Sequence, residues 1–189
     1  MIQIEFTRRF SMAHRLWSDP ASKCATPHGH NEFVRLVLGT PVAADWGQSN
    51  MSHSFDALKS LWHGFIDKAL DHALQLNASD PLLGYFQAQE PDRLKHIVVF
   101  DGDPTTEALV VALTAKARAL LATCAPSVHV LSVSIEETPT NTVSLTADAF
   151  DAIRWSAGAW SHRADYSLND LCPAEAWPVL PRPANGVCP

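Results

Sequence analysis

The sequence predicts an α+β fold in which an antiparallel sheet is covered on one face by helices. The expected elements follow one another as strand, strand, helix, helix, strand, strand. Apolar residues recur at every second position in the expected strands and at every third or fourth position in the expected helices. With 189 residues, of which 47% are hydrophobic, the chain is long enough for one ordinary domain with its own core.

Two strands are expected near the N-terminus. Residues 2–14 alternate between apolar and polar side chains, as in a strand with one buried face. Residues 32–38, with the sequence EFVRLVL, are rich in β-branched and aromatic residues and form the second expected strand. The segment between the two strands is a loop that contains Cys24.

The first helix is expected to begin after Ser54, whose side chain can cap it. Its apolar residues recur at helical spacing and are Phe55, Leu58, Trp62, Phe65, Ala69 and Ala73. A loop that contains Pro81, Gly84 and Pro91 is expected to follow. A short apolar stretch, residues 97–100, comes after that loop.

The sequence DGDPTTE marks the start of the second helix. Either Asp103 or Thr105 can cap it, Pro104 suits the first turn, and Glu107 interacts favourably with the helix dipole. The buried stripe of this helix is expected to consist of Leu109, Leu113, Ala117, Leu120 and Leu121.

Two further strands are expected at residues 128–138 and 142–147, with a turn between them. A possible short helix, 148–155, leads into a tail rich in tryptophan, proline and alanine that ends PVLPRPANGVCP. We therefore expect a domain of residues 1–147 and a C-terminal extension of residues 148–189. Such a tail favours a surface wrap or partial disorder over a second domain.

The composition excludes several classes of protein. A net charge of -6 and the lack of a basic stripe argue against a nucleic-acid partner, although a small phosphorylated ligand needs only a few cations. No apolar run approaches the roughly 20 residues that span a bilayer, and the N-terminus lacks the apolar core of a signal peptide. We expect a cytoplasmic protein without membrane partners. Its four cysteines show no paired spacing, so a disulfide framework is not expected.

Three histidines form a candidate zinc site. His28 and His30 flank Gly29, and in an extended backbone their side chains point to the same face. His14 shares the parity of the apolar residues before it, so it would project from the buried face near the end of its strand. Alone, His14 would be interpreted as an ordinary surface or half-buried histidine. Next to the His-Gly-His sequence it becomes the third ligand expected of a catalytic zinc ion.

Cys24 allows three interpretations from the residues alone. It is an inert thiol, a fourth ligand that closes a structural zinc site, or a reactive thiolate activated by zinc and by Lys23. The sequence pattern does not separate the last two.

Asp71 and His72 form a second candidate group, because a carboxylate can orient an adjacent imidazole and raise its basicity. The alternative is a pair of solvated residues at a helix end. Neighbours on a helix do not face each other, so a partnership would need local unwinding or a third group.

Glu137 continues the apolar parity of the strand at 128–138. A carboxylate at the end of a buried face needs a partner, since an unpaired buried charge is costly. That partner is either an internal arginine or the hydrogen-bond donors of a ligand.

Six segments occur in the order found in one known family and together span about residues 1–147. They are FSMAHR (10–15), KCATPHGHN (23–31), FDALK (55–59), DHALQLN (71–77), DPTTEAL (103–109) and IEET (135–138). With them the chain resembles the 6-pyruvoyl-tetrahydropterin synthase and 6-carboxytetrahydropterin synthase family. The resemblance implies a tunnelling (T-) fold, with a four-stranded antiparallel sheet and two helices per subunit. It also implies a homotrimer or homohexamer in which the sheets join into a β-barrel and active sites lie between subunits.

The resemblance also implies a role for each matching residue. The zinc ligands are His14, His28 and His30. Cys24 is the proton-abstracting base, helped by Asp71 and His72 of a neighbouring subunit. Glu137 anchors the pterin ring, and the residues near the pterin end of the site are Thr105, Thr106 and Glu107.

The implied substrate is 7,8-dihydroneopterin triphosphate. The Cys-x-x-x-His-Gly-His spacing resembles the bacterial 6-carboxytetrahydropterin synthases of queuosine biosynthesis, which favours a product formed with release of acetaldehyde and triphosphate. The alternatives are 6-pyruvoyl-tetrahydropterin formation and a non-catalytic zinc- or pterin-binding protein. The chain departs from the family at Glu32, which stands where an aromatic residue is usual, in the longer loop 78–103 and in the tail from 148.

Overall fold

The computed structural model describes residues 1–42, 46–47, 50–154 and 158–177. Within these ranges it contains one sheet of six strands, in the order β4-β3-β1-β2-β5-β6. The strands are β1 (Ile2–His14), β2 (His28–Thr40), β3 (Leu74–Asn77), β4 (Ile97–Phe100), β5 (His129–Thr138) and β6 (Asn141–Thr146). The α-helices are α1 (Phe55–Phe65), α2 (Pro81–Gln89), α3 (Thr106–Cys124) and α4 (Ala147–Ala152).

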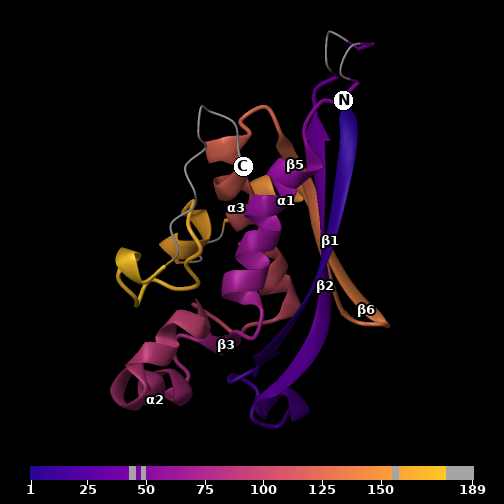
Figure 1. The fold of residues 1–189 in the computed structure, drawn as a ribbon. Helices are drawn as coiled ribbons and strands as arrows, with labels where there is room; N and C mark the ends of the chain where they lie inside the picture. The colour runs from indigo at the N-terminus through magenta and orange to yellow at the C-terminus, as the bar shows by residue number, and fades with distance from the viewer. Residues whose placement is uncertain (43–45, 48–49, 155–157, 178–189) are drawn as a thin grey trace.

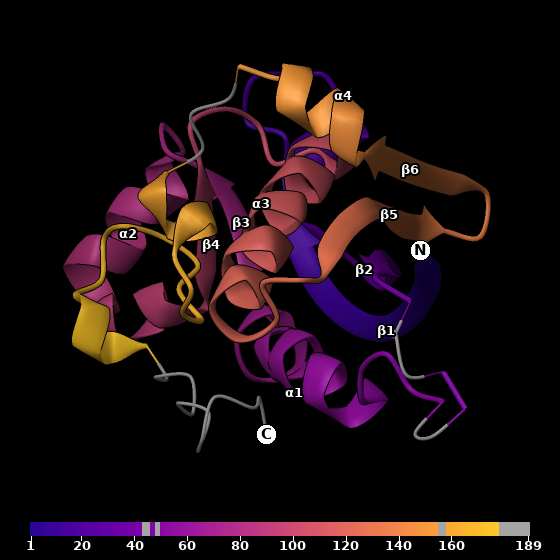
Figure 2. The ribbon, with the colours of Figure 1, turned by 90° about the horizontal axis from the view of Figure 1, so that it is seen from above.

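Helices α1 and α3 pack against one face of the long strands (Figure 1; Figure 2). β1 pairs with β2, β2 with β5, and β5 with β6, all antiparallel. Even-numbered side chains of β1 and β2 point toward the helices and form the core with them, among them Phe6, Phe10, Val34 and Leu36. The predicted α+β fold and the two strands at 128–147 are therefore confirmed. None of the helices in the described ranges is long and apolar enough to cross a membrane.

The expected count of four strands is wrong. β3 and β4 add two short strands beyond β1, and both pairings are parallel, so the sheet is mixed and not purely antiparallel. β3 follows a π-helical turn, Ile66–Leu70, after which the chain leaves the helix at Asp71. Strands of four residues are too short to display a clear alternation. The sequence pattern therefore did not show β3, and it marked residues 97–100 only as a short apolar stretch.

The prediction of a loop at 78–103 is also wrong, because its first half contains a helix. Residues 81–89 form α2, and Asp80 caps this helix by accepting a hydrogen bond from the backbone N–H of Leu82. Pro81 occupies the first turn, where its missing N–H and fixed φ are tolerated. A 3-10 helix, Pro91–His96, then leads into β4. The proline that suggested a loop is thus a helix-start signal.

The helix ends differ from the sequence expectation in detail. Ser54 precedes α1 without a capping hydrogen bond from its side chain, and Phe55 is 57% exposed. Thr105, not Asp103, caps α3 by accepting from the N–H of Ala108. α4 ends at Ala152, and residues 155–157 of the expected short helix lie outside the described residues.

The described part of the C-terminal extension enters the core and does not merely wrap the surface. Trp160, Tyr166 and Leu168 are buried in the same cluster as α1 and α3. The extension also pairs with the edge strand β4, because Val99 donates its N–H to the carbonyl of Leu168 at 3.3 Å. The sequence PVLPRPANGVCP, residues 178–189, lies outside the described residues.

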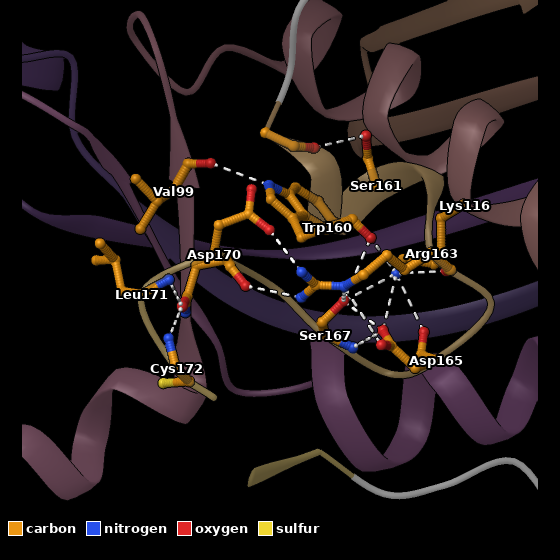
Figure 3. A network of polar contacts seen from close by, with 12 residues as sticks. Val99, Lys116, Trp160, Ser161, Arg163, Asp165, Ser167, Asp170, Leu171 and Cys172 are labelled. Atoms are coloured by element: carbon orange, nitrogen blue, oxygen red, sulfur yellow. Dashed lines mark hydrogen bonds and ion pairs between the residues drawn. The ribbon is translucent and has the colours of Figure 1, made fainter. Parts of the chain in front are cut away.

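A buried lysine of α3 holds this extension in place (Figure 3). The side chain of Lys116 is fully buried, and its Nζ donates to the carbonyls of Trp160, Arg163 and Asp165 at 2.5, 3.1 and 3.0 Å. Asp165 also places a carboxylate oxygen 3.7 Å from this nitrogen. Carbonyl acceptors around an ammonium group offset the cost of removing it from water.

Candidate metal centre and adjoining cavity

The three candidate metal ligands meet where β1 ends and β2 begins. The antiparallel register sets His14 opposite His28 and Met12 opposite His30. The ring centroids of the three histidines lie 4.6 to 5.3 Å apart. A Cβ atom at Gly29 would lie 3.1 Å from the carbonyl oxygen of Met12, so a larger residue there would push against the strand that carries His14.

The donor set fits a divalent metal ion such as zinc. One ligand nitrogen from each histidine lies within 4.8 Å of the other two. His14 directs Nδ1 at the carbonyl of Pro104 (2.9 Å) and His28 directs Nδ1 at the carbonyl of Thr26 (2.8 Å). A carbonyl only accepts, so in the neutral form of each ring Nδ1 carries the proton and Nε2 carries the lone pair. These two Nε2 atoms face each other at 3.1 Å, an arrangement that a cation between them stabilises.

The electrostatics of His14 point the same way. Burial lowers the pKa of His14; the Pro104 carbonyl opposes the shift, and the nearby rings of His28 and His30 reinforce it. A lowered pKa keeps the imidazole neutral, and the neutral imidazole is the form that binds a metal.

A cavity of about 510 Å³ adjoins the three histidines. Most of the other candidate site residues also line it. Its lining consists of His14, Leu16, Cys24, His28, His30, Thr105, Thr106, Glu107, Glu137, Thr138, Asn141 and Val143. The fold therefore gathers residues from β1, β2, α3, β5 and β6 around one space.

Glu137 is held by a hydroxyl and not by an arginine. Thr106, the first residue of α3, donates its hydroxyl to Oε1 of Glu137 at 2.6 Å. This contact joins the start of α3 to the end of β5 and orients the carboxylate at the cavity wall. The partner expected from the sequence was an arginine or a ligand, and a threonine was not foreseen.

Cys24 lines the cavity but does not belong to the histidine cluster. It lies on a 3-10 turn, Lys23–Ala25, which Ser22 caps by accepting from the N–H of Cys24. Among the described residues, the group close enough to share one ion comprises the three histidines without Cys24. This geometry favours a three-histidine site over a closed site with a cysteine ligand.

Asp71 and His72 lie elsewhere in the chain's own fold. They leave the helix, and His72 adopts a left-handed conformation with φ of 66°, so the two side chains meet at 2.9 Å. Asp71 also accepts from the N–H of Ser11 at 2.7 Å. Burial acts to raise the pKa of Asp71, but the hydrogen bonds from Ser11 and His72 outweigh it and lower the pKa. His72 borders a separate surface depression that also touches His30. Neither Asp71 nor His72 lines the 510 Å³ cavity.

Glu32 is a residue whose burial the sequence reasoning missed. It shares the face of His28 and His30 on β2, and only 2% of its surface is exposed. Its Oε2 atom has no hydrogen-bond partner among the described residues. Burial, together with the nearby charge of Glu137, raises the pKa of Glu32 to about 8. In the sequence HGHNEFV, Glu32 follows His28 and His30 at a spacing of two residues. This spacing could have placed it on the same face of the strand as the two histidines.

The family model described as 6-pyruvoyl tetrahydropterin synthase matches residues 3–148. Among curated proteins, no sequence match was found.

Three solved structures are similar to this chain in fold. An uncharacterized protein from Wolinella succinogenes is 24% identical with a TM-score of 0.61, over 77% of this chain and 98% of that one. The 6-pyruvoyl tetrahydropterin synthase of Caenorhabditis elegans is 24% identical with a TM-score of 0.53, over 77% and 95% of the two chains. The corresponding enzyme from Plasmodium vivax is 18% identical with a TM-score of 0.53. At these identities the matches show a shared fold, and they confirm the predicted tunnelling fold.

Proposed function

This chain belongs to the 6-pyruvoyl tetrahydropterin synthase family, and we propose that it is a zinc-dependent 6-carboxytetrahydropterin synthase. Its substrate would be 7,8-dihydroneopterin triphosphate, and its other products acetaldehyde and triphosphate. One observation carries the proposal: the facing Nε2 atoms of His14 and His28 border the same cavity as the carboxylate of Glu137. A metal-binding group and a ring-binding group are thus set around a single space.

The histidines would hold zinc through Nε2 of His14, Nε2 of His28 and one ring nitrogen of His30. When bound, zinc polarises the hydroxyl groups of a substrate side chain and makes them more acidic. The Pro104 and Thr26 carbonyls fix the tautomer and orientation of His14 and His28, which prepares both rings for this role.

Cys24 is the proposed proton acceptor, because it faces the cavity without joining the histidine cluster. Asp71 and His72 are the proposed partners in proton transfer. They do not line the cavity of their own chain, so this role requires a second copy that brings them there. A homotrimer or homohexamer is proposed for that reason.

Glu137 is the proposed anchor for the pterin ring. Thr106 occupies Oε1 of Glu137, and the second oxygen is free to accept from a ring N–H or amino group. Thr105 and Glu107 also line the cavity. They would contact the ring from the start of α3.

The domain division stays a proposal as well. Residues 1–147 would form the pterin-binding domain, and residues 148–189 an extension that supports it. Placement of the protein in the queuosine pathway rests on the Cys-x-x-x-His-Gly-His spacing, and 6-pyruvoyl-tetrahydropterin formation is the alternative product.

The test is to incubate zinc-loaded protein with 7,8-dihydroneopterin triphosphate without oxygen and to identify the products by mass spectrometry. We expect 6-carboxytetrahydropterin and acetaldehyde. A pyruvoyl product would assign the alternative activity, and no turnover with zinc bound would contradict both. Cys24→Ala should keep one zinc per chain but lose turnover, whereas zinc loss in this variant would support the structural interpretation.

A further inference from the structure

The loop between His14 and Cys24 carries the cysteine to the cavity. Its two ends lie close together, because Leu16 donates its N–H to the carbonyl of Cys24 at 2.8 Å. In between, residues 15–22 form no helix or strand. The position of the Cys24 thiol therefore depends on contacts that this loop makes with other parts of the chain.

One carboxylate, that of Asp103, supplies the central contact. It accepts from the backbone N–H groups of Trp17 at 3.1 Å and Ser18 at 3.1 and 3.2 Å. It also accepts from the side-chain amide of Asn77, at the end of β3, at 2.9 Å. Two separate segments of the chain are thus tied to one side chain.

Asp103 also lies next to the residue that orients the metal ligand. The carbonyl of Pro104 accepts from Nδ1 of His14, so the same short segment contacts both His14 and the first residues of the loop that leads to Cys24. Burial acts to raise the pKa of Asp103, but hydrogen bonds from Asn77, Ser18 and Trp17 outweigh it and keep the pKa below its usual value. The carboxylate is therefore charged at neutral pH, and charged acceptors make the stronger hydrogen bonds.

A second contact secures the beginning of the loop. Arg15, the residue after His14, forms a two-pronged ion pair with the buried carboxylate of Asp80, which also caps α2. The guanidinium group of Arg15 stacks over Trp17, with 4.9 Å between its central carbon and the ring centroid. Both acidic residues belong to the stretch that the sequence suggested was a long loop.

From these contacts we infer that Asp103 is a positioning residue that sets the distance between the Cys24 thiol and the histidine cluster. The inference rests on the proposed function in so far as Cys24 is the base. It also gives a role to the segment that contains α2 and β4. Through Asp80 and Asp103 this segment holds residues 15–18, at the start of the loop that carries Cys24. A proton acceptor displaced by about 1 Å loses about 100-fold in rate.

The first experiment compares Asp103→Ala and Asp103→Asn with the exposed neighbour Asp101→Ala as matched control. In Asp103→Ala we expect kcat to fall about 100-fold while KM changes by less than about twofold and zinc content stays unchanged. Asp103→Asn keeps one acceptor oxygen and should recover part of the loss. A wild-type kcat, or a loss of kcat that only follows a loss of zinc, would overturn the inference.

The second experiment needs no substrate and separates this inference from the proposed function. Zinc-loaded variants are treated with iodoacetamide, and labelling of Cys24 is followed by peptide mass spectrometry. A released loop exposes the thiol, so we expect labelling about fivefold faster in Asp103→Ala than in Asp101→Ala. This result would support the positioning role even if the pterin triphosphate were not turned over, and equal rates would refute it. If Asp103→Ala does not fold, the Asn variant carries both measurements.

Discussion

The two groups of polar side chains around Lys116 and around His14 differ in how completely their hydrogen-bonding atoms are paired. Lys116 is fully buried, yet its ammonium group meets three carbonyls and lies near the carboxylate of Asp165. Near His14, the Nε2 atoms of His14 and His28 face each other at 3.1 Å, and on β2 the Oε2 atom of Glu32 has no partner among the described residues. Buried polar atoms in folded proteins are nearly always paired.

The difference separates a structural role from a binding role. The network of Lys116 is complete within the chain, so its contribution is to hold residues 160–167 against α3 and α1. The three histidines could hold a metal ion. Under the proposed function their facing nitrogens are paired only when that ion is bound, so the unpaired nitrogens cost the fold some stability without it. Mutations in the two groups should therefore affect different measurements.

The largest effect is expected from His28→Ala. Two histidines do not replace a three-ligand site, so bound zinc should be lost and kcat should fall by at least about 1000-fold. Metal analysis of the purified protein and the product assay measure both effects. His129→Ala, an exposed histidine at the start of β5, is the control. Retention of one zinc per chain in His28→Ala would contradict the proposed centre.

The next largest effect is expected from Lys116→Met. This substitution should lower the stability of the fold and leave the metal content unchanged. The substitution removes the donor shared by three carbonyls and the charge near Asp165, so the free energy of unfolding should fall by about 3 kcal/mol. Urea unfolding measures this, with the exposed Lys95→Met as control. Zinc content per folded chain should stay constant, and a selective loss of zinc would break the distinction between the two groups.

A smaller, pH-dependent effect is expected from Glu32→Gln. The carboxyl group has its ordinary pKa of 4.5 when unfolded and about 8 when folded. Between these values the folded state keeps a proton that the unfolded state has lost, so stability falls as pH rises from about 4.5 to 8.

Glu32→Gln removes this slope and should be about 1–2 kcal/mol more stable than the original chain at pH 8, with no difference near pH 4. Urea unfolding in the presence of a chelator measures it, because a bound cation would itself stabilise the carboxylate. Parallel stability curves for the two proteins across this pH range would show that Glu32 is not held in its protonated form.

Much of the site could be predicted because it depends on local patterns. Side-chain parity placed His14, His28 and His30 on inward-facing positions of two strands, and the same argument placed Glu137 on β5. The start of α3 was equally visible, since Thr105 has a strong preference for the capping position. Pro104, expected in the first turn, instead lies just before the cap.

Other elements could not be predicted from such patterns. β3 and β4 are too short to show a periodicity, and α2 was hidden by a proline that fits either a loop or a first helical turn. Asp103 looked like a helix cap, but its partners Trp17 and Ser18 come from the other end of the domain.

By itself the sequence determined the fold class, the three histidines that could hold a metal ion and the residue types available for chemistry, because these follow from spacing within a few residues. Only the tertiary structure decided that His14 faces His28, that Cys24 shares their cavity without joining the cluster, and that Asp71 and His72 lie outside it. It also decided that Lys116 of α3 binds the backbone carbonyls of residues 160, 163 and 165 in the C-terminal extension. These outcomes depend on contacts between residues far apart in the chain, whose free energies no local pattern contains.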